Sequence, residues 1–260
     1  MPHEFEKTML RAGSLLVGAM LAAAGGYLDG FTYVGHGHVF ANAMTANVVL
    51  LGATVFTRNW HSAVRYFPPI AAFVAAVWVS QAVQVVSSRS RTQAPFRSVL
   101  FLEISVLLVL VFLPPTTDIP FTTSIAFAAS VQMQTFNKVN GRSYSSTFTT
   151  GNLRTLAEAA FTRLFRGHDR EAAGTVRDFS VIVTAFLLGA VAGGGATRTF
   201  GNHALWFDIG LLILVEIVLQ TGWGLPSAVR LSPRNVRQAD VKHKNGARRR
   251  DGHQPSDLPV

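Results

Sequence analysis

The residues of this chain that could do chemistry are polar groups placed inside apolar runs. Asp29 follows a Gly-Gly pair in one run, and Thr45 and Asn47 lie in the next. An ionised carboxylate at the centre of a bilayer costs roughly 2.5–3.5 kcal/mol, so an acid there is a candidate for function. Hydroxyl and amide groups can replace the hydration shell of a small solute or an ion.

A weaker copy of this pattern follows in the second half of the chain. Thr150 and Asn152 lie 105 residues after Thr45 and Asn47, and they are preceded by Gln132 and Met133. Met133 stands at the position that corresponds to Asp29, so the second copy has lost a polar group. We predict one asymmetric, substrate- or ion-binding site between the two halves, formed by Asp29, Thr45, Asn47, Gln132, Thr150 and Asn152. The alternative is that these groups only form hydrogen bonds between helices, each worth typically about 0.6 kcal/mol.

Four further charges fall in or beside apolar runs, and they occur as two matching pairs. Glu103 corresponds to Glu216, and Arg65 corresponds to Arg177. The acids could carry protons or pair with the two arginines, and ion pairing is the preferred interpretation. Arg65 could also pair with Asp29, and otherwise both arginines are most simply interface charges that set the topology.

Signatures of an enzyme are missing from the sequence. It shows no Ser-His-Asp set, no phosphate-binding glycine loop and no metal-ligand spacing. His36 and His38 are separated by one residue and would not share a helix face. We therefore expect no catalytic residue, no cofactor and no metal.

The elements that must position these groups are membrane helices. The chain is 49% hydrophobic and 14% charged, and its apolar residues gather in runs near the length that crosses a bilayer. Small residues recur at every fourth position of several runs, as in Gly18, Ala22, Gly26 and Gly30, which lets helices approach closely. The pattern predicts an all-α, polytopic membrane bundle with segments at 14–35, 39–57, 67–87 (opening at the Pro68-Pro69 pair), 98–113, 122–137, 145–165, 179–196 and 203–223.

The matching positions also predict an internal duplication. We divide the chain into a cytoplasmic N-terminus (1–13), a first repeat (14–113), a linker (114–121), a second repeat (122–223) and a basic, disordered tail (224–260). The tail holds eight of the 23 Lys and Arg residues and three of the 14 acids. This placement fits a cytoplasmic tail near anionic lipid headgroups and argues against a nucleic-acid partner. Besides the lipid bilayer, self-association stays open as a further partnership.

The basic residues favour six spans over eight. If 39–57 and 145–165 are short or re-entrant, ten Lys and Arg residues lie in inner loops and three in outer loops. If all eight segments cross, the bias disappears. Three spans per repeat would leave the two halves inverted, which is a pattern typical of transporters.

Two stretches resemble a known family. These are Gly25-Gly26-Tyr27-Leu28-Asp29 with the run from Asn42 to Gly52, and Gln132 with Thr149-Thr150-Gly151-Asn152-Leu153. They are similar to the signatures of the YoaK-like bacterial membrane proteins, apart from Ala46 and Met133, which depart from them. The resemblance implies a multipass protein of the bacterial inner membrane and no defined activity. From the residues we predict a small-solute or ion transporter, with a non-transporting membrane scaffold as the alternative.

Overall fold

The computed structural model of this protein describes residues 8–90, 95–114, 118–166 and 169–225. The elements used below are α2 (Leu15–Gly35), α3 (Met44–Phe56), α4 (Trp60–Ser90), α5 (Pro95–Val111), α6 (Asp118–Thr135), β1 (Lys138–Val139), β2 (Arg142–Ser143), α7 (Thr149–Phe165), α8 (Arg170–Phe200), the 3-10 helix η1 (Gly201–Ala204) and α9 (Leu205–Thr221). The predicted all-α bundle is confirmed. The N-terminal residues 1–7 and nearly all of the basic tail lie outside the described residues.

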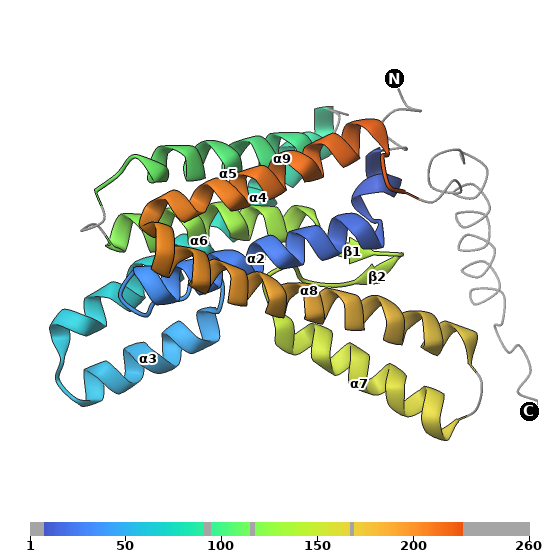
Figure 1. Cartoon of the computed structure of the whole chain (residues 1–260), viewed down its shortest axis with the longest axis horizontal. Helices are drawn as coiled ribbons and strands as arrows, with labels where there is room; N and C mark the ends of the chain where they lie inside the picture. The colour runs from blue at the N-terminus through green and yellow to red at the C-terminus, as the bar shows by residue number, and fades with distance from the viewer. Residues whose placement is uncertain (1–7, 91–94, 115–117, 167–168, 226–260) are drawn as a thin grey trace, which may run out of the picture.

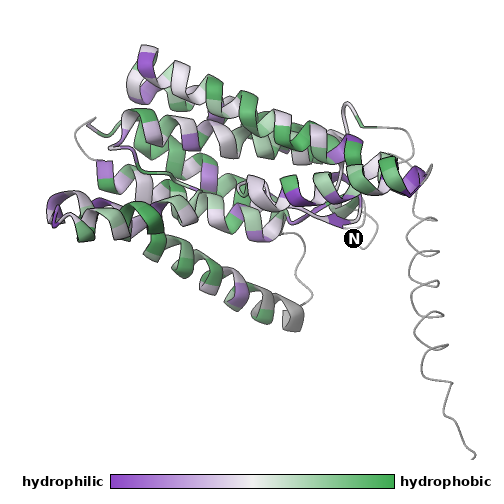
Figure 2. Cartoon of the chain, turned by 90° about the horizontal axis from the view of Figure 1, so that it is seen from below, coloured by the Kyte–Doolittle hydropathy of each residue, from purple (hydrophilic) through white to green (hydrophobic). Residues whose placement is uncertain are grey.

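The protein is a membrane protein. Within the part of the chain that the structure describes, three stretches are long and apolar enough to cross a bilayer, namely Leu15–Gly35, Trp60–Val83 and Arg170–Thr221. Large apolar side chains such as Trp78, Phe101 and Leu188 are exposed on the outside of the bundle. Figure 2 shows apolar residues along much of the length of the helices. Such a surface suits lipid as its solvent.

The two halves of the bundle run in opposite directions (Figure 1). At one end His36, just after α2, bonds Asp118 at the start of α6 (Nδ1–Oδ1, 3.2 Å). At the other end Asn140, just after α6, donates from its backbone to the carbonyl of Gly13, just before α2 (2.7 Å). Helices α2 and α6 are therefore antiparallel, although they occupy matching places in the two halves.

Helix contacts repeat between the halves. Helix α2 packs on α8 while α4 packs on α6, α3 packs on α4 while α7 packs on α8, and α2 contacts α9 while α5 contacts α6. The α5–α9 pair is also antiparallel, because Arg97 at the start of α5 binds Glu216 near the end of α9. These helix contacts of one half thus have counterparts in the other.

Helices α2 and α8 cross through their glycines. A Cβ atom on Gly26 would lie 2.0 Å from the carbonyl oxygen of Phe186, and one on Gly189 would lie 2.0 Å from that of Ala23. Gly30 and Gly193 meet the opposite backbone in the same way. The four-residue spacing of small residues thus lets the two backbones touch, as small-residue faces do in membrane bundles.

Helices α3 and α7 do not run the length of the bundle. Figure 1 shows each beginning near the middle, with α3 leading toward one end and α7 toward the other. Both are sparsely buried, since Met44 and Asn47 are the buried residues of α3 and Asn152 is that of α7. The chain therefore turns back inside the bundle before each of these helices starts.

The predicted helix starts at 67 and 179 show the largest errors. Helix α4 begins at Trp60 and contains Pro68 and Pro69, which we had expected in its first turn. Asn59 caps this start by accepting from the backbone of Ser62 (3.2 Å), and a proline inside a membrane helix is tolerated when neighbours satisfy the freed backbone groups. Helix α8 begins at Arg170, nine residues early, where Asp169 accepts from the backbone of Glu171 (2.8 Å).

A short β-hairpin between α6 and α7 was not predicted. Strands β1 and β2 pair antiparallel around Asn140 and Gly141, whose φ angles are 49° and 80°. An Asn-Gly pair is the strongest short signal for such a turn. Asp178 of α8 holds the hairpin by accepting from Asn140 (2.8 Å) and Arg142 (3.3 Å).

The tie between α2 and α6 should respond to pH. His36 is buried between Phe31 and Phe121, and burial lowers the pKa of its imidazole, although the bond to Asp118 opposes this. A lowered pKa favours neutral His36 in the folded state, so stability is full above the unfolded pKa near 6.5 and is lost as pH falls below it. His36 can change the free energy of unfolding by at most about 1.4 kcal/mol per pH unit.

Thermal unfolding in detergent between pH 5 and pH 8 measures this effect. The variant His36→Phe should keep the aromatic contacts with Phe121 and lose the part of the pH dependence that belongs to His36. An unchanged pH profile in the variant would contradict the assignment.

Candidate functional site: a polar junction at the middle of the bundle

The site is built from two chain reversals that meet beside Gly25, the midpoint of α2. The first reversal is residues 36–43, between α2 and α3. The second is residues 144–148, between the hairpin and α7. We call these the first loop and the second loop. Both carry polar groups into an otherwise apolar interior.

Asp29 holds the first loop. Its Oδ1 accepts from the backbone N–H of Asn42 at 2.8 Å, and Asn42 in turn donates from Nδ2 to the carbonyl of Gly25 at 3.0 Å. Thr32 accepts from the backbone of Ala41 at 3.1 Å. Asp29 and Asn42 are buried. No ion pair joins Asp29 to Arg65 among the described residues, and Arg65 instead donates to the carbonyl of Gly37 (3.4 Å).

Asn47 and Asn152 close the two loops by the same device. Asn47 accepts from the backbone N–H of Phe40 (3.1 Å) and donates to its carbonyl (2.6 Å). Asn152 does the same with Ser145, at 3.2 Å and 2.7 Å. In each case the partner lies seven residues earlier, so one amide replaces the pairing that the loop backbone lacks.

Gln132 holds the second loop and links it to Glu103. Ser146 donates to Gln132 Oε1 (3.1 Å), and Gln132 Nε2 donates to Glu103 Oε2 (2.6 Å). At the place that corresponds to Asp29, the sulfur of Met133 accepts from Thr147 (3.1 Å). The second loop is therefore held by neutral groups where the first loop uses a carboxylate.

The two loops touch the same point of α2. Asn42 binds the carbonyl of Gly25, and a Cβ atom on Gly25 would lie 2.5 Å from the carbonyl oxygen of Ser146. A side chain at this position would push the second loop away. Asp29, Asn42, Gly25, Ser146 and Gln132 thus form one chain of contacts across the junction.

Thr45 and Thr150 do not join the junction. Both are exposed, whereas Asn47 and Asn152 are buried. Residues two apart on a helix face nearly opposite sides, so an inward Asn turns the Thr outward. The spacing already contained this information, and the sequence interpretation did not use it.

The predicted partners of the two glutamates were wrong. Glu103 is buried and binds Gln132, while Glu216 is partly exposed and binds Arg97 and Gln220. Arg177 pairs with its neighbour Asp178. The matching sequence positions of the two acids therefore have different environments.

Asp208 is the residue that the sequence interpretation missed. It is fully buried at the start of α9, and neither of its carboxyl oxygens has a hydrogen-bond partner among the described residues. It faces α5, which packs antiparallel on α9: the Arg97–Glu216 contact brings Glu103, six residues after Arg97, level with the turn of α9 that carries Asp208, eight residues before Glu216. An acid inside the apolar run 203–223 could have been recognised from its position alone.

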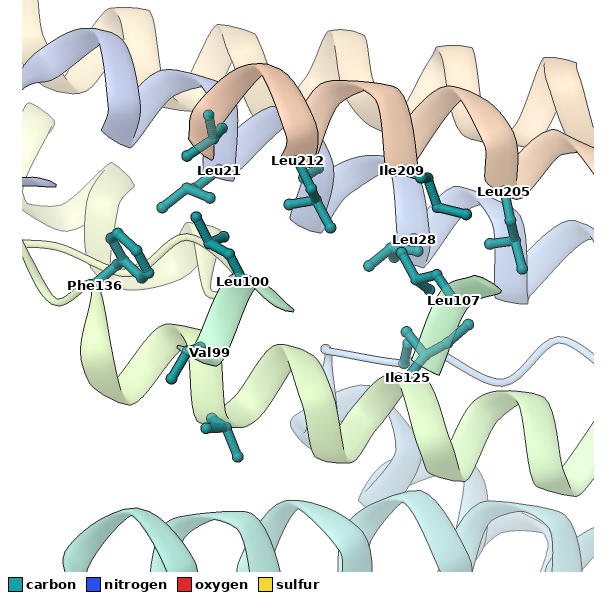
Figure 3. Close-up of a cluster of buried hydrophobic side chains, with 14 of the residues drawn as sticks. Leu21, Leu28, Val99, Leu100, Leu107, Ile125, Phe136, Leu205, Ile209 and Leu212 are labelled. Carbon is teal, nitrogen blue, oxygen red and sulfur yellow. The ribbon is translucent and has the colours of Figure 1, made fainter. Parts of the chain in front are cut away.

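The apolar frame around these groups comes from α2, α5, α6 and α9. Figure 3 shows Leu21 and Leu28 of α2, Leu100 and Leu107 of α5, and Leu205 and Leu212 of α9 converging on one cluster. Glu103 and Asp208 lie between these residues in sequence, on the same buried helix faces. No group of three or more metal-ligating side chains occurs within the described part of the chain.

Comparison with known proteins places the chain in a family. A family model matches residues 17–218, which include α3, α7 and the whole junction. The chain belongs to the DUF1275 family. That family is described as proteins of unknown function. Comparisons with curated proteins and with solved structures found no match.

Proposed function

We propose that this DUF1275 protein is a small-solute or ion transporter whose site lies at the junction between two inverted repeats. The observation that carries the proposal is that α3 and α7 start from polar loops meeting at Gly25 and lead to opposite ends of the bundle. Inverted repeats with interrupted segments near the midplane are a pattern of secondary transporters. In alternating access, the two halves rock about such a fixed central site.

The polar chemistry of the junction supports this role. Irregular backbone is tolerated at membrane depth only where protein buries it or where it lines a water-filled cavity. Asp29 of α2 supplies a carboxylate that holds the first loop, and Glu103 and Asp208 supply two more behind the second loop. A site with carboxylates, amides and loop carbonyls can exchange the hydration shell of a small polar solute or cation for protein groups. The role requires no catalytic residue and no cofactor.

The alternative is a membrane scaffold, and one observation favours it. The side chains of Asn47, Asn152 and Asp29 form hydrogen bonds with the backbone of the first and second loops. A structural junction of this kind would need no solute.

Substitution of Asp29 by Asn separates the two roles. The amide keeps an acceptor for Asn42 and removes the charge, so we expect normal abundance and little change in unfolding temperature. A screen of solutes (amino acids, sugars, organic acids and alkali cations) against the purified protein should find a class that raises the unfolding temperature of the wild type. A ligand at 100 times its Kd adds about 2.7 kcal/mol.

We expect Asp29→Asn to reduce or abolish that stabilisation, whereas the exposed Thr45→Ala should keep it. If no solute class stabilises the wild type, and any defect of Asp29→Asn tracks lower abundance, the scaffold role holds instead.

We further propose that the protein lies in the bacterial inner membrane with the hairpin end in the cytoplasm, as the YoaK-like resemblance implies. The hairpin end carries Lys138, Arg142, Arg163, Arg166, Arg170 and Arg177, while the opposite end carries Arg58, Arg65 and Arg198. This bias agrees with the positive-inside rule.

Single cysteines in this Cys-free chain test the orientation. With an impermeant thiol reagent on intact cells, His61→Cys should be labelled and Ser143→Cys should be protected until the cells are opened. Both positions are exposed in the structure, so protection reports the membrane rather than burial. The reverse pattern would place the hairpin end outside the cell and contradict the proposed orientation.

A further inference from the structure

We propose that Glu103 and Asp208 form a proton-binding pair that carries the coupling ion of the transporter. The coupling role of the pair rests on the proposed transporter function, but the protonation of the pair can be tested separately. It concerns residues behind the second loop, on α5 and α9, and does not involve Asp29.

Most of the carboxyl oxygens of Glu103 and Asp208 lack a hydrogen-bond donor among the described residues. An ionised carboxylate only accepts hydrogen bonds, so it needs N–H or O–H groups around it. Of the four carboxyl oxygens in the pair, Glu103 Oε2 has a donor, from Gln132. Glu103 Oε1 and both oxygens of Asp208 have no partner among the described residues.

The described residues also provide no cation that would compensate the charge of the pair. None of the ion pairs between described residues includes Glu103 or Asp208. Gln132 of α6, which donates to the pair, is neutral, and the Tyr27 hydroxyl of α2 donates to the carbonyl of Ala204. On their own helix faces the two acids are flanked by apolar residues of the core cluster, Leu100 and Leu107 on α5 and Leu205 and Leu212 on α9, which Figure 3 shows.

These observations favour protons as the ligand. Two buried carboxylates that share one donor and no cation among the described residues cannot both stay ionised in an apolar interior, because burying an unpaired charge costs several kcal/mol. A proton needs no coordination shell, whereas a metal ion needs several oxygen ligands. The pair therefore holds at least one proton, taken from water when the site opens and returned to water on the other side.

The hydrogen-bond chain gives the pair a connection to the junction. Ser146 in the second loop binds Gln132, and Gln132 binds Glu103. Movement of the second loop would shift the amide that supplies the single donor of Glu103. Solute binding at the junction can thus change how strongly the pair holds its proton.

Infrared spectroscopy of the purified full-length protein tests the pair. We expect the wild type at neutral pH to show the C=O stretch of a buried, protonated carboxylic acid, and Asp208→Asn or Glu103→Gln to lose intensity there. An amide resembles the neutral acid in shape, so either variant should unfold near the wild-type temperature. Glu216→Gln is the matched control, because Glu216 is paired with Arg97 and should contribute no such band.

The rival ligand is a metal cation, with Na⁺ and Mg²⁺ as probes. If either ion raises the unfolding temperature of the wild type and Asp208→Asn removes the effect, the pair is a cation site and the proposal is overturned. Equal carboxylic-acid bands in the wild type and in both variants would also overturn it. If the variants lose the band but the wild type transports no solute, the protonated pair stands and the transporter role is rejected. If the wild type transports a solute but shows no band, the transporter role stands and the protonated pair is rejected.

Discussion

Replacing Gly26 by alanine should strongly destabilise the bundle. The new methyl group would fall 2.0 Å from the carbonyl oxygen of Phe186, in the backbone of α8, which cannot rotate away as a side chain can. Overpacking costs typically about 1–3 kcal/mol and sometimes more, and a backbone clash belongs at the upper end. Gly189→Ala should behave alike, because its methyl group meets the carbonyl oxygen of Ala23.

The control position lies in α8, the helix that also carries Gly189. Gly195 of α8 has no atom within 4 Å of an added Cβ, so Gly195→Ala should be neutral or stabilising, since alanine favours helix by up to about 1 kcal/mol. Thermal unfolding in one detergent compares the three variants. Equal stability of Gly26→Ala and Gly195→Ala would show that the helices are not held at backbone contact.

Replacing Asn47 or Asn152 by alanine should release a loop. Each substitution removes two hydrogen bonds and leaves a partly buried backbone N–H and C=O without partners. An unsatisfied buried group costs about 1–3 kcal/mol, so we expect a loss of about 2–4 kcal/mol for either variant. Thr45→Ala and Thr150→Ala are matched controls two residues away and should stay within about 0.5 kcal/mol of the wild type.

Limited proteolysis can locate the effect. The first loop should become accessible in Asn47→Ala and the second in Asn152→Ala, with the opposite loop unchanged. Equal exposure of both loops in both variants would mean that the amides stabilise the bundle as a whole.

The sequence predicted the features that depend on composition and helical period. The membrane class, the helix order and the glycine faces of α2 and α8 follow from apolar length and four-residue spacing. The starts of α4 and α8 were wrong because polar residues precede the apolar core in both helices. Their capping residues, Asn59 and Asp169, were the better signal.

The junction was harder to predict because its partners are distant in sequence. Asn47 was singled out as a ligand for a solute, and its bonds go to Phe40. Glu103 was expected to bind an arginine, and contacts with α6 gave it Gln132 instead. Position in an apolar run identifies a costly side chain, but the tertiary packing decides which group satisfies it.

The Asn-based loop closures and the Asp29–Met133 difference have a consequence for how the two halves could diverge. Both halves keep the amide that folds the loop, while one half carries a carboxylate and the other a thioether at the corresponding place. Two identical subunits in opposite orientations could not hold this difference, because every substitution would appear twice. Joining both halves in one polypeptide lets the architecture stay twofold while the electric field at its centre points one way.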